Sequence, residues 1–73
     1  MHYTIAIIEN VHSGRKVFLE NSGNKMYIII EEKGREAYFT KRLWPDEAER
    51  IFGQLCEYTY KSLYDFEYLC SLA

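Results

Sequence analysis

The stretch of residues 45–72 constrains this sequence most, because apolar residues recur along it with the period of an α-helix. At about 100° per residue, one side of the predicted helix collects apolar and small residues, while charged residues and tyrosines fall on the other. The first side holds Ala48, Ile51, Phe52, Leu55, Thr59, Ser62, Leu63, Phe66, Leu69 and Cys70. The second holds Arg50, Glu57, Lys61, Tyr64 and Tyr68. The pattern predicts an amphipathic helix whose apolar side the rest of the chain must cover.

The start of this helix is better marked than its end. Pro45 suits the first helical position, where its missing N–H would be unpaired in any case. Asp46, Glu47 and Glu49 place negative charge near the positive end of the helix dipole. Residues 58–60, Tyr-Thr-Tyr, are poor helix formers. We therefore expect one long helix over residues 45–72, with any kink or break between residues 58 and 62.

The pattern of residues 1–43 predicts four short β-strands, at residues 3–11, 15–20, 25–32 and 35–40. Turn-forming residues separate them, namely His12-Ser13-Gly14, Asn21-Ser22-Gly23-Asn24 and Lys33-Gly34. Connections this short favour an antiparallel meander, because parallel strands need longer crossovers. The predicted fold is α+β: a four-stranded antiparallel meander with one long C-terminal amphipathic helix packed on one face (ββββα). All 73 residues form a single domain, with the sheet in 1–43 and the helix in 45–72.

Strict alternation along the strands predicts which residues face the helix. The helix-facing set is Tyr3, Ile5, Ile7, Val17, Leu19, Met26, Ile28, Ile30, Ala37 and Phe39. The other face then carries Ala6, Ile8, Phe18, Tyr27, Ile29 and Tyr38 among polar residues. This second face is more apolar than a solvated sheet face usually is, which is typical of an interaction site. We expect a second copy of the chain or another protein there; alternatively, loops or a C-terminal segment folded back as a second helix cover it.

A second candidate contact surface lies on the outer side of the predicted helix. Tyr60, Tyr64 and Tyr68 are four residues apart and would stack along one side of a continuous helix. Tyrosine is enriched in interface hot spots, and Glu57 and Asp65 would make this patch acidic. The alternative is that some of these tyrosines pack on the sheet edge as part of the fold.

Motifs for chemistry are weak. His2 and His12 have no acid or nucleophile paired with them by spacing, and the glycine-containing turns match no phosphate-binding pattern. Cys56 and Cys70 would lie about 21 Å apart on a continuous helix, too far for a disulfide. Trp44 is expected to pack near the helix start. We expect no enzymatic activity, no metal and no cofactor.

Charge divides the chain into a mildly basic part and an acidic part. Residues 1–43 hold seven Lys or Arg against five Glu, and residues 44–73 hold two against six acids. Lys33, Arg35, Lys41 and Arg42 bracket the last hairpin, and by fold analogy such a hairpin sheet with a helix is similar to small DNA-arm-binding domains of the integrase type. Interleaved glutamates neutralise this basic patch, so nucleic-acid binding or regulation through it is the alternative function.

These observations favour a small non-catalytic protein-binding module, expected to be a homodimer. An acidic helix with Asp46, Glu47, Glu49, Glu57, Asp65 and Glu67 also suits a phage- or plasmid-type inhibitor that occupies a surface of a host nucleic-acid-handling complex. No apolar run is long enough to span a membrane, and the first residues lack the features of a signal peptide. We therefore expect a cytoplasmic protein.

Overall fold

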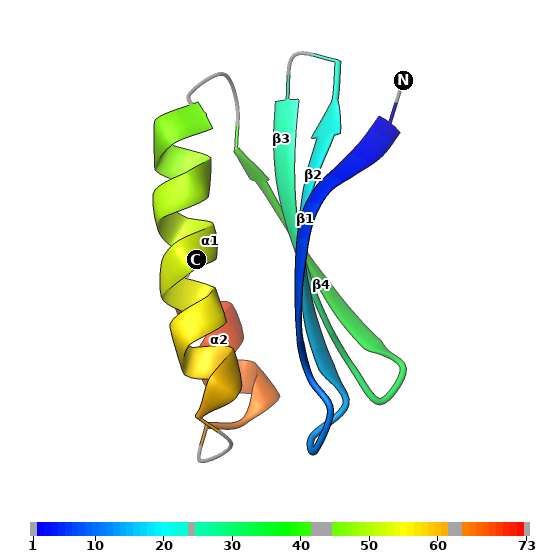
Figure 1. The fold of residues 1–73 in the computed structure, drawn as a ribbon, viewed down its shortest axis with the longest axis vertical. Coiled ribbons are helices and arrows are strands. Elements are labelled where there is room, and N and C mark those ends of the chain that lie inside the picture. The colour runs from blue at the N-terminus through cyan, green and yellow to red at the C-terminus, as the bar shows by residue number, and fades with distance from the viewer. Residues whose placement is uncertain (1, 24, 42–44, 62–63, 73) are drawn as a thin grey trace.

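A computed structural model describes residues 2–23, 25–41, 45–61 and 64–72 of the chain. It has a four-stranded antiparallel sheet in the order β1-β2-β3-β4, followed by two helices on one side of it (Figure 1). The strands are β1 (His2–Asn10), β2 (Arg15–Ser22), β3 (Lys25–Glu32) and β4 (Arg35–Lys41), and the helices are α1 (Pro45–Tyr60) and α2 (Phe66–Ser71). The predicted fold class, a meander followed by a long amphipathic helix, is confirmed.

The turns explain why the strands pair without crossovers. Lys33 and Gly34 both have positive φ, at 52° and 82°, as the two central residues of a type I′ hairpin turn require. Gly23, with φ 63°, follows the end of β2. Residues 21 and 22, which were predicted to lie in a turn, instead extend β2. The tight hairpins leave no length for a helix between strands, so both helices follow the sheet.

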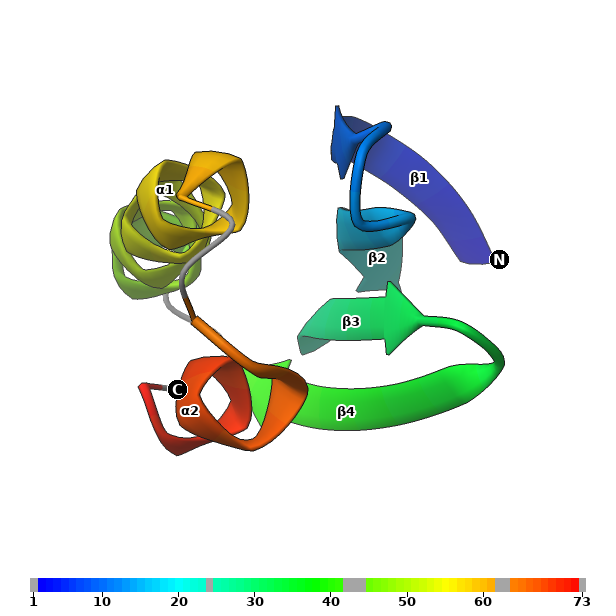
Figure 2. The ribbon, with the colours of Figure 1, turned by 90° about the horizontal axis from the view of Figure 1, so that it is seen from below.

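Both helices lie against one face of the sheet, which we call the inner face (Figure 2). The core consists of alternate residues of β2 and β3 and the apolar stripe of the two helices. Its buried members are Val17, Leu19, Met26, Ile28, Ile30, Ala48, Ile51, Leu55, Phe66 and Leu69. Of the predicted stripe, six members are buried and two more are partly buried against the core. The buried ones are Ala48, Ile51, Leu55, Thr59, Phe66 and Leu69, and the partly buried ones are Phe52 and Cys70. Ser62 and Leu63, also predicted for the stripe, lie outside the described residues.

In β1, the predicted inward-facing residues are wrong at Ile5 and Ile7. The β1–β2 pairing shifts between Thr4 and Ala6, so Ile5 is the extra residue of a β-bulge. A single extra residue exchanges the two faces of the strand beyond it. Ala6 and Ile8, predicted to face away from the helix, therefore pack against the core. Ile5 and Ile7 are 47% and 56% exposed.

The helix is not continuous through residues 45–72, and α1 ends at Tyr60. The end falls within the interval expected from the sequence. Buried side chains from the sheet help to fix this end: the Asn10 amide donates to the Thr59 carbonyl at 2.6 Å, and the Arg15 guanidinium donates to the Tyr64 carbonyl. These donors satisfy carbonyls that a continuing helix would have paired internally.

The chain then turns back and α2 packs on the same inner face as α1, close to β3 and β4 (Figure 2). Asp65 begins α2 as its N-cap, with its carboxylate accepting from the Tyr68 backbone N–H at 2.8 Å. Phe66 and Leu69 are buried in the shared core. A second helix folded back on the sheet was the alternative to one long helix, and the structure has it. In that alternative it covered the other face of the sheet, whereas α2 packs on the inner face with α1.

Candidate functional site

The strand register aligns four apolar residues across the sheet face that the helices do not cover, which we call the outer face. Ile7 of β1 lies opposite Phe18 of β2, Phe18 opposite Ile29 of β3, and Ile29 opposite Tyr38 of β4. Residues directly opposite in an antiparallel pair share a face, so these four side chains form one continuous row. We refer to Ile7, Phe18, Ile29 and Tyr38 as the outer row.

The outer row is substantially open to solvent. Ile7 is 56% exposed and Tyr38 is 62% exposed, while Phe18 and Ile29 between them are half-buried. Phe18, Ile29 and Tyr38 were predicted to lie on this face, as was Tyr27. The bulge replaces the predicted Ala6 and Ile8 with Ile5 and Ile7, so the face is more apolar than the alternating pattern indicated.

Polar residues flank the outer row on both sides. Towards the hairpin turns at Gly14 and Gly34, the register aligns Glu9, Lys16, Glu31 and Glu36. On the other side it aligns Thr4, Glu20 and Tyr27. An apolar centre with a polar rim is the usual anatomy of a protein interface.

Two hydrogen bonds organise this polar rim. Thr4 Oγ1 donates to Glu20 Oε2 at 3.1 Å, and Glu20 is only 8% exposed. The Tyr38 hydroxyl donates to the Glu36 carboxylate, and this bond and the carboxylate's charge raise the pKa of Tyr38. Both bonds orient a side chain of the rim before any partner binds.

A shallow hollow of about 220 Å³ opens on the outer face. It joins the middle of the outer row to the rim residues on both sides of that row. Its lining consists of Thr4, Phe18, Glu20, Ile29, Glu31, Glu36 and Tyr38. A hollow lined by two apolar side chains, a tyrosine and three carboxylates suits an apolar or cationic side chain from a partner.

The ladder of Tyr60, Tyr64 and Tyr68 that a continuous helix would form is interrupted, because α1 ends at Tyr60; only Tyr64 and Tyr68 of the three stack on each other. Tyr58 takes the place of Tyr60: its ring meets that of Tyr64 edge-on at 5.1 Å, and that of Tyr68 at 5.8 Å. Tyr64 and Tyr68 stack with their ring centroids 4.6 Å apart. Burial and the neighbouring tyrosines raise the pKa of Tyr68. This tyrosine cluster joins α1 to α2, so it has a structural role within the chain.

Glu57 and Asp65, predicted as the acidic part of that contact surface, also have partners within the chain. Lys61 Nζ lies 3.5 Å from the Glu57 carboxylate, one helical turn further on. Asp65 caps α2, as described above. Exposed carboxylates remain along α1 at Asp46, Glu47 and Glu49.

The basic residues of the last hairpin do not form one patch. Lys33 and Arg35 lie at the turn between β3 and β4, whereas Lys41 is the last residue of β4, about 20 Å away at 3.3 Å per residue. Arg35 donates to the Glu67 carboxylate and its guanidinium lies 4.3 Å from the centroid of the Phe66 ring. Arg42 and Trp44 lie outside the described residues. The arrangement offers little support for phosphate binding.

The Arg35 ion pair has a consequence for pH. Its hydrogen bond lowers the pKa of Glu67 below the ordinary value of about 4.5. The pair therefore adds stability above that pH and loses it as the pH falls through the lowered pKa. We expect Glu67→Gln to reduce the free energy of unfolding near neutral pH, by an amount that shrinks in acid. Urea unfolding of both proteins from pH 7 to pH 3 measures this; a pH-independent deficit, or one equal to that of Glu49→Gln on α1, would contradict it.

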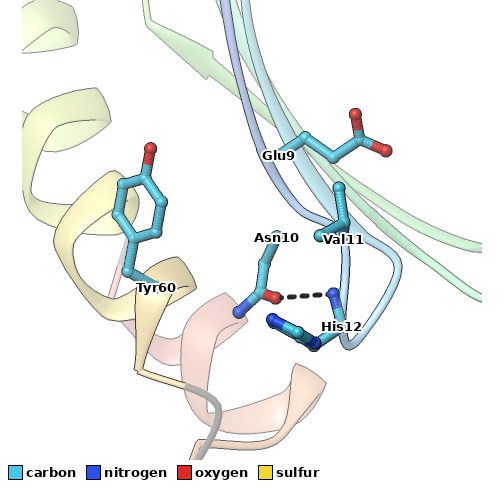
Figure 3. A pocket seen from close by; sticks show the side chains of 5 residues that line it. All are labelled: Glu9, Asn10, Val11, His12 and Tyr60. Carbon is cyan, nitrogen blue, oxygen red and sulfur yellow. Dashed lines mark hydrogen bonds between the residues drawn. The ribbon is translucent and has the colours of Figure 1, made fainter.

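A second hollow, of about 280 Å³, lies where the β1–β2 turn meets the end of α1 (Figure 3). Its lining is Glu9, Asn10, Val11, His12 and Tyr60. The Asn10 side chain accepts from the His12 backbone N–H at 3.0 Å and so shapes the turn. In Figure 3 the Glu9 carboxylate and the Tyr60 hydroxyl point away from the His12 ring, so these groups do not converge on one reacting atom.

In the part of the chain that the structure describes, little supports metal binding or a reactive cysteine. Within it, no three His, Cys, Asp or Glu side chains gather as a metal site would require. Cys56 and Cys70 are free and half-buried, and burial raises the pKa of the Cys56 thiol to about 11. A thiol with a raised pKa is a poor nucleophile at neutral pH. No helix within the described residues is long and apolar enough to cross a membrane.

Comparison with known proteins does not identify a function for this chain. No protein-family model matches the chain, and no curated protein or solved structure is significantly similar to it.

Proposed function

We propose that this chain is a non-catalytic protein-binding module that binds its partner through the outer face of the sheet. The observation that carries the proposal is the outer row, which places apolar side chains from all four strands at the centre of a face that neither helix covers. Burying such a row would stabilise a complex by about 25 cal/mol per Å² of apolar surface removed from water.

The rest of the chain supports this use of the outer face. The inner face is occupied by α1 and α2, and the tyrosine cluster and the Arg35–Glu67 pair are taken up in joining the helices to each other and to the sheet. The outer face has a preformed hollow and a polar rim held by hydrogen bonds. A rigid face of this kind loses little side-chain freedom on binding.

Charged substitutions in the outer row test this proposal. Ile7→Lys and Tyr38→Lys change exposed side chains, so both variants should fold as the wild type does. We expect each to lose the proteins that immobilised wild-type chain captures from its native host. Val11→Lys is the matched control, because Val11 is 75% exposed but lies at the β1–β2 turn, outside the outer row. Capture that is equal for all four proteins would show that binding occurs elsewhere.

A second candidate function rests on the exposed acids of α1. Asp46, Glu47, Glu49 and Glu57 are exposed along this helix, with Arg50 as the basic residue among them. Such a surface could occupy a basic groove that normally holds phosphates, as a phage- or plasmid-type inhibitor of a host nucleic-acid-handling complex would. The two free cysteines suit a reducing compartment, which makes the cytoplasm the proposed site of action.

Charge reversal distinguishes this candidate from the first. Asp65 is unsuitable for reversal because it caps α2, and its loss would cost about 1 kcal/mol of stability. Glu47→Lys with Glu49→Lys changes only exposed positions of α1. If α1 mimics phosphates, this double variant loses the captured protein while Ile7→Lys retains it; the opposite pattern supports the outer face.

A further inference from the structure

We propose that the partner segment bound by the outer face carries an arginine, whose guanidinium enters the hollow beside Phe18 and Tyr38 while apolar neighbours of that arginine cover the outer row. This inference rests on the proposed use of the outer face and adds the chemistry of the partner. Three observations support it: the excess of carboxylates on this face, their meeting at the hollow, and the aromatic rings beside them.

Carboxylates outnumber cations on the outer face. The four carboxylates beside the outer row belong to Glu9, Glu20, Glu31 and Glu36. Among the described residues of this face, the cations at neutral pH are Lys16 and Lys25. Lys16 lies opposite both Glu9 and Glu31, so one ammonium is shared between two carboxylates. Lys25 begins β3 and lies about 13 Å along it from Ile29, which exceeds the Debye length at physiological salt. Charge complementarity therefore requires a cationic partner.

Two of these carboxylates form an unfavourable pair. Glu31 of β3 and Glu36 of β4 lie directly opposite each other, and like charges in that position destabilise a sheet. Lys16 lies on the far side of Glu31 from Glu36, because β2 and β4 flank β3 on opposite sides. An uncharged partner that covered the outer row would partly desolvate this pair at a further cost. A cation between the two carboxylates would offset both penalties.

The hollow is where a cation would meet these carboxylates. Glu20, Glu31 and Glu36 all line it. Glu20 already accepts from Thr4 and so contributes negative charge rather than a binding site. The hydrogen bond from Tyr38 to Glu36 is the main cause of the raised pKa of Tyr38, and the charges of all three carboxylates add to the rise. An ionised carboxylate has about four acceptor sites, of which the Tyr38 hydroxyl takes one, so Glu36 retains sites for a cation.

The rings beside the hollow favour arginine over lysine. Phe18 and Tyr38 line the hollow, and a guanidinium stacks on aromatic faces while its N–H groups donate to carboxylates in its own plane. The chain already holds one of its own arginines in this way. The Arg35 guanidinium lies 4.3 Å from the centroid of the Phe66 ring and donates to the Glu67 carboxylate. The hollow offers the same combination of groups to an arginine from outside.

Two peptides that differ in one charge test the inference. The first is leucine-arginine-leucine, blocked at both ends, and the second replaces arginine with citrulline, its uncharged isostere. Each is added to millimolar concentration while nuclear magnetic resonance follows the isoleucine methyl groups and backbone amides of the wild-type chain. We expect the arginine peptide to shift Ile7, Ile29, Glu31 and Glu36 and to bind at least about fivefold more tightly than the citrulline peptide. Added salt should reduce that advantage.

A matched pair of variants locates the charges responsible. Glu31→Gln with Glu36→Gln removes both charges but keeps an acceptor oxygen for the Tyr38 hydroxyl, and it should bind the two peptides equally. Glu47→Gln with Glu49→Gln removes as much charge from exposed positions of α1 and should keep the wild-type preference. Circular dichroism, and unchanged binding of the citrulline peptide, show that both variants remain folded.

The outcomes separate this inference from the proposed function. Equal binding of the two peptides on the outer row of the wild type, or an arginine preference that survives in Glu31→Gln with Glu36→Gln, overturns the arginine and leaves the outer face as a binding surface. Shifts confined to α1, or no shifts at millimolar peptide, also overturn the inference. In that case, if Ile7→Lys still abolishes capture of a host protein, the proposed function stands with a partner of different chemistry. If Ile7→Lys captures as the wild type does, both proposals fail.

Discussion

Replacement of Glu32 by alanine is expected to lower the free energy of unfolding by about 3–5 kcal/mol, the usual cost of leaving a buried charge unpaired. Arg15 is 4% exposed, and its Nε donates to the Glu32 carboxylate at 2.5 Å. Its Nη2 donates to the Tyr64 carbonyl, and its Nη1 is buried with no hydrogen-bond partner in the described residues, so removal of the carboxylate leaves the guanidinium without its counter-charge. A chain of this length has a total stability of about 4–11 kcal/mol, so the variant should lose between about a third and all of it.

Equilibrium urea unfolding monitored by circular dichroism measures this loss. Glu31→Ala is the matched control, because Glu31 precedes Glu32 in β3 but lies on the outer face, and it should stay within about 0.5 kcal/mol of the wild type. The double replacement Arg15→Met with Glu32→Met removes both charges and should be less destabilised than Glu32→Ala alone. Equal stabilities of Glu32→Ala and Glu31→Ala would refute the buried ion pair.

Replacement of Leu69 by alanine is expected to cost about 2–5 kcal/mol, as for other fully buried leucines. Leu69 is 0% exposed although it belongs to a helix of only six residues. Such a short helix is not stable by itself, so its folding depends on packing against the core. Thermal and urea unfolding measure the loss, with Val11→Ala as an exposed apolar control. A change as small as that of Val11→Ala would mean that α2 is not docked on the sheet.

The regular parts of the fold follow from local sequence patterns. Strand and helix positions depend on alternation, turn residues and the 3.6-residue period, and these signals lie within a few residues of one another. The turn at Gly34 and the start of α1 at Pro45 are examples, because glycine adopts positive φ without strain and proline holds φ near the helical value.

Features that depend on distant residues could not be predicted in the same way. The bulge at Ile5 arises from how β1 pairs with β2, and alternation within β1 gives no sign of it. The end of α1 was expected near residues 58–62 from helix propensity, but its polar partners Asn10 and Arg15 lie 49 residues away in the chain. Tyr58 was missed as a member of the tyrosine cluster because that cluster forms only after the chain turns back.

The outer row contains three residues that alternation predicted and one that it did not. Phe18, Ile29 and Tyr38 were placed on the outer face by alternation alone, which was sufficient because β2, β3 and β4 pair without a bulge in the described register. Ile7 required knowledge of the register. Its addition completes the outer row across all four strands, and that continuity is what favours a protein interface over scattered exposed residues.

The isoleucines provide the most direct measurement of whether the outer face is the interface. Ile5, Ile7 and Ile29 lie on the outer face, whereas Ile8, Ile28, Ile30 and Ile51 face the core. With isoleucine methyl groups labelled, a soluble paramagnetic agent should relax the first three strongly in dilute protein and much less once a second copy or another partner is bound. The four core methyl groups should be protected throughout. Outer methyl groups that stay equally accessible at millimolar concentration and in the presence of captured partner would contradict the account.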